Sequence, residues 1–79
     1  MEIFNKDEIN YIESLYKFCY IKCRTNDIPN NKKCIAEIIE NIFDNNEHRN
    51  NLLKFFRTKD LIISLITFLC YKALYEINK

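Results

Sequence analysis

Glycine is absent from this 79-residue sequence, and proline occurs only once. Phosphate-binding loops and dinucleotide-binding turns rely on glycine, so both kinds of site are excluded. Tight β-hairpins rely on glycine as well, which makes a β-rich fold a poor match to the sequence. Basic and acidic residues nearly cancel, at 12 and 11, and this balance excludes a strongly basic nucleic-acid-binding arm.

Valine is also absent, although isoleucine is the commonest residue. The abundant Ile, Asn, Lys, Phe and Tyr are encoded by codons rich in A and T, whereas the scarce Gly, Ala, Arg and Pro use codons rich in G and C. We infer an AT-rich genome, such as that of a virus, a phage or plasmid of a low-GC bacterium, or an AT-rich parasite. The same bias fills tolerant surface positions with Asn and Lys, so these residues do not by themselves mark a site.

The first residues of the chain lack the basic and apolar regions of an export signal. We therefore expect a cytoplasmic protein, in the host cytoplasm if it is viral, with free thiols as the default state of its four cysteines. The longest apolar run, residues 61–71, is shorter than the roughly 20 residues that span a bilayer. It predicts a buried core helix, with no membrane span; a C-terminal membrane anchor is a lesser alternative.

Apolar residues recur along most of the chain at spacings of three and four, which is typical of amphipathic helices. The polar segment Thr58-Lys59-Asp60 contains neither glycine nor proline. It fits a break between two helices, with Thr58 or Asp60 as the cap of the second, and it also fits an exposed turn of one long helix. We favour a break. Asn5 with Glu8, and Asp44 with Glu47, have the spacing of helix-capping boxes, and Phe4 with Ile9 that of a hydrophobic staple. The predicted helices cover residues 6–24, 31–43, 45–57 and 60–77.

The predicted fold is all-α: a single domain over residues 1–79, built as a compact antiparallel bundle of three to four short helices. Short connections favour packing between neighbours in sequence. The last helix is apolar nearly all round as far as Tyr71, so we expect it to be buried on most sides at the centre of the bundle. One of its sides could instead be buried in a second chain.

Cys19 and Cys23 lie one helical turn apart, and together with Cys34 and His48 they could supply four soft ligands to zinc. Both thiols fall on the apolar stripe of their helix, however, and free cysteine commonly packs as a small hydrophobe. We therefore predict core packing, no metal and no cofactor; a disulfide between Cys34 and Cys70 is a lesser alternative. A lone histidine at the start of a helix is typical of a solvated surface position, and we predict no catalytic residue and no enzyme.

Two segments, 17–33 and 49–59, gather most of the basic residues, and a nucleic acid could bind them if they meet in the fold. The phenylalanines and tyrosines are too many for one small core, so some tyrosines are expected to be partly exposed, as at protein interfaces. The candidate interaction residues are Tyr11, Tyr20, Lys32, Lys33, Arg49, Lys54, Arg57, Tyr71 and Tyr75.

The function that fits these features best is a non-enzymatic protein–protein interaction module. Its setting would be a virus- or phage-encoded accessory protein that binds and blocks a host protein. One alternative is a small structural subunit of a larger complex or homo-oligomer, for example a homodimer. The other is a nucleic-acid-binding helical protein that uses segments 17–33 and 49–59. We recognise no known family in the sequence.

Overall fold

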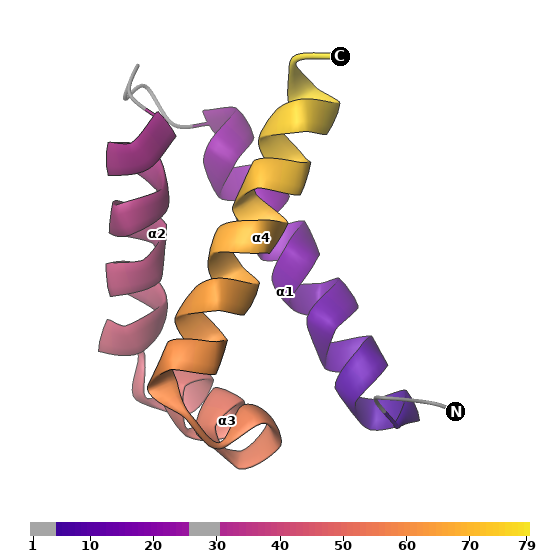
Figure 1. The fold of residues 1–79 in the computed structure, drawn as a ribbon, viewed down its shortest axis with the longest axis vertical. Helices are drawn as coiled ribbons and strands as arrows, with labels where there is room; N and C mark the ends of the chain where they lie inside the picture. Colours follow the sequence, from indigo (N-terminus) through magenta and orange to yellow (C-terminus); the bar gives the residue numbers. More distant parts are fainter. Residues whose placement is uncertain (1–4, 26–30) are drawn as a thin grey trace.

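The computed structural model describes residues 5–25 and 31–79, which form four α-helices and no strand (Figure 1). This confirms the predicted all-α bundle and the break before the last helix. Phe4, one half of the expected staple, lies outside the described residues. The helices are α1 (Lys6–Thr25), α2 (Asn31–Asp44), α3 (Asn46–Phe56) and α4 (Lys59–Ile77).

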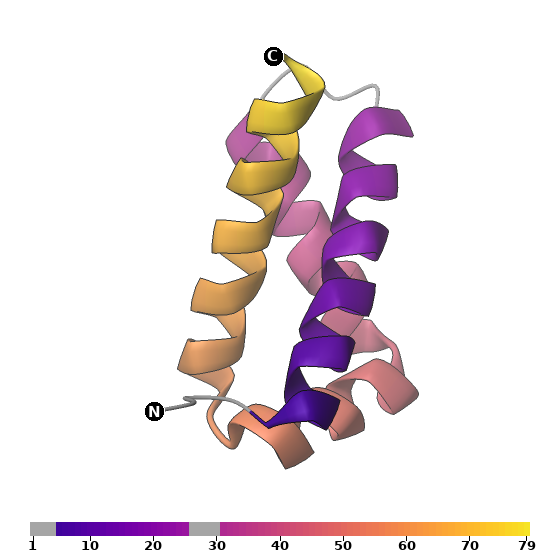
Figure 2. The same cartoon turned by 90° about the vertical axis from the view of Figure 1, so that its right-hand side faces the viewer.

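Helices α1, α2 and α4 run along the long axis of the molecule, and the short α3 lies across one end (Figures 1 and 2). The chain ascends in α1, descends in α2 and ascends again in α4, so α1 and α4 point the same way. The most extensive contact joins α1 and α4, which are not neighbours in sequence. This differs from the expected packing order, because α3 turns the chain back and places α4 on α1.

The core lies where the three long helices meet and continues to α3. Each helix contributes residues at helical spacing, so that one face of each turns inward. α4 contacts every other helix. The buried residues are Leu15, Cys19 and Cys23 of α1, Cys34, Ile35, Ile38 and Ile42 of α2, Leu52 and Phe56 of α3, and Ile62, Ile66, Leu69, Cys70 and Ala73 of α4.

Local side-chain contacts set where the helices begin. The backbone amide of Glu8 donates to Oδ1 of Asn5 at 2.8 Å, as the capping-box spacing predicted. The second predicted cap was wrong by one residue: Asn45, and not Asp44, caps α3 by accepting from the amide of His48 at 3.0 Å. Asp44 instead ends α2, and the hydroxyl of Thr58 caps α4.

Helix α3 buries Leu52 and Phe56 fully and leaves Leu53 exposed. One expectation about burial was wrong. α4 was expected to be buried on most sides, but one of its faces is open to solvent along its whole length. The reason is geometric: α1, α2 and α3 together cover only the inner side of α4.

Candidate protein-interaction surface

The exposed face of α4 concentrates large apolar side chains. Seven large hydrophobic side chains are exposed among the described residues, and four of them belong to this helix. Phe68 is 65 % exposed and Tyr75 is 68 % exposed, far more than rings of a small core would be. We call the exposed residues that share this face the α4 stripe: Leu61, Ser64, Phe68, Tyr71, Tyr75 and Asn78.

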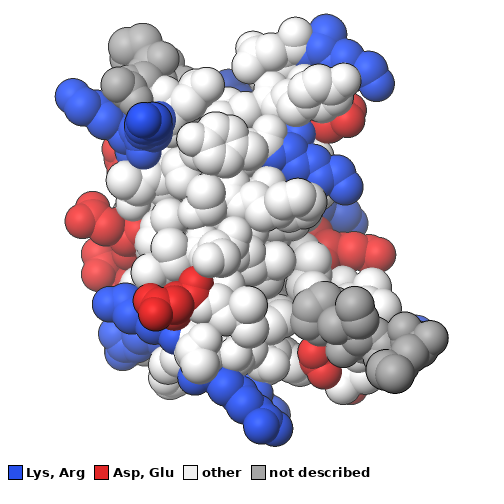
Figure 3. Space-filling view, in the orientation of Figure 1, with Lys and Arg blue, Asp and Glu red and all other residues white. Residues whose placement is uncertain are grey.

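No member of the α4 stripe carries a charge. Figure 2 shows α4 in the outer layer of the bundle, and Figure 3 shows the face that it forms. The middle of this face is uncharged, and charged side chains gather around its edge (Figure 3). A contiguous apolar area with a polar rim is the usual anatomy of a protein-binding surface.

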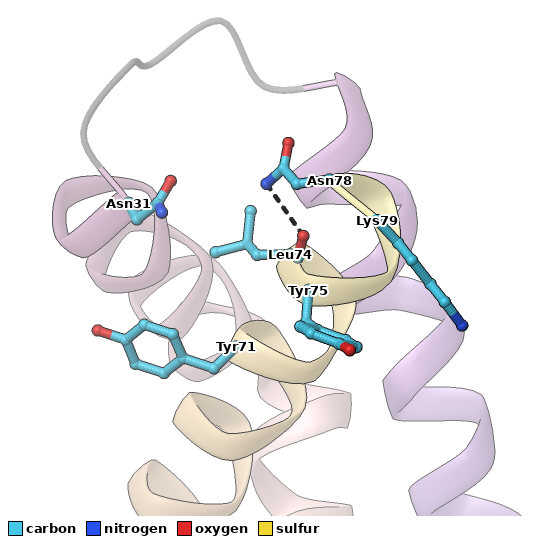
Figure 4. Close-up of a pocket in the computed structure, with 6 residues that line it drawn as sticks. All are labelled: Asn31, Tyr71, Leu74, Tyr75, Asn78 and Lys79. Carbon is cyan, nitrogen blue, oxygen red and sulfur yellow. Dashed lines mark hydrogen bonds between the residues drawn. The ribbon is translucent and has the colours of Figure 1, made fainter.

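The two tyrosines of the α4 stripe border a hollow between the last turns of α4 and the first turn of α2 (Figure 4). Tyr71 reaches from α4 towards Asn31 of α2, whereas Tyr75 points to the other side of Leu74. The side-chain amide of Asn78 donates to the Leu74 carbonyl at 3.0 Å and so closes the helix end. Both rings are therefore held on a well-formed helix, with no contact that removes them from solvent.

The other two tyrosine candidates lie elsewhere. Tyr11 is half-buried between α1 and α3, with its ring centroid 5.2 Å from that of Phe55. Tyr20 is half-buried against the core, with its centroid 6.3 Å from that of Tyr16. The structure therefore does not bring Tyr11 and Tyr20 together with Tyr71 and Tyr75 on one face.

The basic candidates do not form one patch. Lys32 and Lys33 begin α2 at one end of the molecule, whereas Lys54 and Arg57 lie in or next to α3 at the other end (Figure 1). The longest dimension of the molecule, 36 Å, runs between these ends. Lys32 and Lys33 therefore do not share one phosphate-binding surface with Lys54 and Arg57.

Arg49 stabilises the turn between α2 and α3. Its guanidinium donates to the carbonyl oxygen of Phe43, at 3.3 Å, and to Oδ1 of Asn46. These bonds tie the start of α3 to the end of α2 and partly bury the side chain. Arg49 therefore holds the turn between the two helices together and is a poor candidate for contacts with a partner.

All four cysteines are free and lie together in the core, between α1, α2 and α4. Cys70 interacts with Cys19 and with Cys23, and Cys23 interacts with Cys34. The fourth thiol of this cluster is thus Cys70, whereas His48, the fourth ligand of the alternative zinc site, packs against Phe18. Within residues 5–25 and 31–79, no three His, Cys, Asp or Glu side chains are arranged to hold a metal ion.

The environment of these thiols favours their protonated form. Burial raises the pKa of Cys23 to about 12, and it also raises the pKa of Cys34. Interaction with Cys19, together with burial, raises the pKa of Cys70. Because the thiolate is the nucleophile, these side chains act as packing groups.

His48 is half-buried, and its ring centroid lies 5.8 Å from that of Phe18 on α1. The expectation of a solvated surface histidine was wrong, because the first turn of α3 packs its ring against α1. This contact joins two helices and gives the histidine a role in packing.

Leu61, Ser64, Phe68 and Asn78 are part of the candidate surface, but sequence reasoning did not single them out. The signal was present as a repeat of exposed positions, since Leu61, Phe68 and Tyr75 are seven residues apart. The repeat could not be recognised from the sequence, because the opposite side of the same helix is equally apolar. Only the positions of α1, α2 and α3 show which side is covered.

A comparison of the chain with protein-family models, with curated proteins and with solved structures finds no match. Among the helices of the described residues, none combines the length and the apolar character that crossing a bilayer requires.

Proposed function

We propose that the protein is a non-enzymatic protein–protein interaction module and that the α4 stripe is its binding surface. The observation that carries the proposal is the exposure of Phe68, Tyr71 and Tyr75 along one uncharged helix face. Aromatic side chains contribute strongly to binding when a partner covers them. Exposed apolar rings lower the solubility of a protein, and a partner that covers them removes this effect.

The chemistry of the core supports a non-enzymatic role. The raised pKa values of Cys23, Cys34 and Cys70 keep the thiols protonated near neutral pH, where they are poor nucleophiles. His48 packs against Phe18 and does not reach the thiol cluster. The described side chains of the candidate surface offer rings and amides for contact, and no pair of groups poised to exchange a proton.

The AT-rich composition supports one biological setting. In this setting, a virus or phage encodes the protein as a small accessory factor that binds and blocks a host protein in the host cytoplasm. Capture of a host protein from a lysate can test both this setting and the binding surface. The purified protein is immobilised, and nuclease is added to remove bridging nucleic acid.

Three proteins make the capture experiment specific: the parent chain, Phe68→Glu and Ile21→Glu. Ile21 is also exposed, at 59 %, but it lies on α1, so its variant is a matched control for a new surface charge. We expect the parent and Ile21→Glu to retain the same protein and Phe68→Glu to lose it. Equal retention by all three would show that the α4 stripe is not the binding surface.

A further inference from the structure

The spacing of the α4 stripe matches the seam of a coiled coil. Its residues 61, 64, 68, 71, 75 and 78 alternate steps of three and four, which are the core positions of a heptad repeat. All six positions are exposed in the structure. A second helix packed against such a seam would bury it by inserting each side chain between side chains of the partner helix.

We propose that the α4 stripe is covered by the α4 stripe of a second copy of this chain, with the two helices antiparallel. The inference rests on the proposed function, because the second copy would cover the same stripe that is proposed to bind other proteins. In such a pair the same surface is used twice about a two-fold axis, so the stripe must be complementary to itself. The order of its residues meets this requirement.

Side-chain size is complementary when the seam is laid antiparallel on itself. The pairing that uses the whole seam puts Phe68 level with Tyr71 of the second copy, so two aromatic pairs form around the axis. The same alignment puts the large Tyr75 level with the small Ser64. A parallel pair would instead align Ser64 with Ser64 and Tyr75 with Tyr75. The two small serines would leave a gap between the helices, and the two large tyrosines would crowd each other.

Charge favours the same orientation. The seam is uncharged, so no ion is removed from water without a partner when it closes. At each end, the antiparallel pair brings Asp60 of one copy level with Lys79 of the other, whereas a parallel pair would align Asp60 with Asp60. The helix dipoles of the two α4 helices also oppose each other only in the antiparallel pair.

The area is enough for a weak dimer. With side chains of about 200 Å² each, the exposed fractions of Phe68, Tyr71 and Tyr75 amount to roughly 350 Å² of surface per copy. Leu61 and the flanking residues add to this, but the total stays below the area of about 800 Å² per partner that a standard specific interface buries. The dimer should therefore dissociate on dilution, leaving the stripe accessible to a competing partner.

Sedimentation equilibrium of the full chain over a wide range of concentration tests the proposal. We expect the parent to pass from monomer to dimer as its concentration rises. Phe68→Glu should weaken the dimer at least about tenfold, because it places two carboxylates at the centre of the seam. Ile21→Glu should dimerise like the parent, and circular dichroism shows whether each variant is folded.

Cross-linking fixes the orientation. Leu61→Cys and Asn78→Cys are prepared separately, then mixed and oxidised; the native thiols are buried and should not take part. The antiparallel pair predicts a disulfide only between the two different variants. Cross-linking of each variant with itself would overturn the antiparallel pair.

Two further results would overturn the proposal. One is a parent chain that stays monomeric at every concentration; the other is a dimer that Phe68→Glu leaves intact. Loss of lysate capture by Phe68→Glu in a strictly monomeric protein would reject the second copy and keep the α4 stripe as a binding surface for a different protein. The two proposals can therefore fail separately.

Discussion

The rings of Tyr11 on α1 and Phe55 on α3 lie 5.2 Å apart between centroids, with their planes tilted by 31°. The Tyr11 hydroxyl is shielded from solvent and makes no hydrogen bond of good geometry among the described residues, although Asn51 of α3 lies near it. Burial raises the pKa of Tyr11 and the nearby charge of Glu47 raises it further, whereas the side chain of Asn51 lowers it. The ring therefore joins α1 to α3, and its hydroxyl contributes little to that contact.

Replacing this ring should affect folding and leave association unchanged. We expect Tyr11→Ala to lower the free energy of unfolding by about 2 kcal/mol, because it opens a gap between the helices. Tyr11→Phe should cost much less than Tyr11→Ala, since the hydroxyl makes no well-formed hydrogen bond. Urea unfolding measures both changes. A loss of stability in Tyr11→Phe as large as that in Tyr11→Ala would mean that the hydroxyl, and not the ring, joins the helices.

The thiols should be slow to react in the folded protein. Because burial raises the pKa of Cys23 from 9.0 to about 12, very little thiolate forms near neutral pH. We expect iodoacetamide to modify the four cysteines slowly in buffer and quickly in urea, as measured by intact mass. Fast modification of Cys23 in the folded state would show that α1, α2 and α4 open readily around it.

The same shift makes stability depend on pH on the alkaline side. The unfolded chain releases the Cys23 proton near pH 9.0 and the folded chain only near pH 12. The unfolded state therefore binds fewer protons between these values, and stability falls as the pH rises through this range. Urea unfolding between neutral pH and pH 11 should show the fall. Cys23→Ala should show a shallower fall, because one of the thiols that causes it is gone.

How far the sequence predicts the fold is clearest in two places. Asn5 with Glu8 is the only capping pair near the start of α1, so its spacing located the cap correctly. At the start of α3, Asp44 and Asn45 are both good capping residues, and spacing alone could not choose between them. The choice depends on where α2 ends, and there the Arg49 guanidinium donates to the Phe43 carbonyl at 3.3 Å.

The candidate surface was only half predictable. Tyr71 ends the long apolar run and Tyr75 follows it, and the neighbouring Lys72 and Glu76 indicated an exposed position. Leu61 and Phe68 lie inside the apolar run, where a residue on the outer face cannot be told from one on the inner face. Their exposure depends on packing between helices distant in sequence.

A substitution at the junction between α3 and α4 should make the folded protein more stable. Arg57 has a φ of 66°, a region that costs a side-chain-bearing residue conformational energy. Arg57→Gly should therefore raise the free energy of unfolding by up to about 1 kcal/mol. As a companion, Thr58→Ala should lower it by about 1 kcal/mol, because the hydroxyl accepts from the amide of Leu61 at 3.2 Å. Thermal unfolding of both variants would measure these opposite shifts.

Two double variants separate protein binding from nucleic-acid binding. Tyr71→Ala with Tyr75→Ala removes two exposed rings of the α4 stripe and should weaken protein association while leaving the fold intact. Lys32→Glu with Lys33→Glu reverses charge at the start of α2 and should leave that association unchanged. A nucleic-acid-binding protein predicts the opposite pattern, because its affinity depends on basic side chains that neutralise phosphates.

The measurement is fluorescence polarisation with a labelled oligonucleotide at low and high salt, beside sedimentation equilibrium of the same proteins. Since Lys32 and Lys33 lie at the opposite end of the molecule from Lys54 and Arg57, we expect weak oligonucleotide binding that disappears at high salt. Tight binding that the lysine variant abolishes and the tyrosine variant retains would contradict the assignment of the α4 stripe. It would place the function at the end of the bundle where α2 begins.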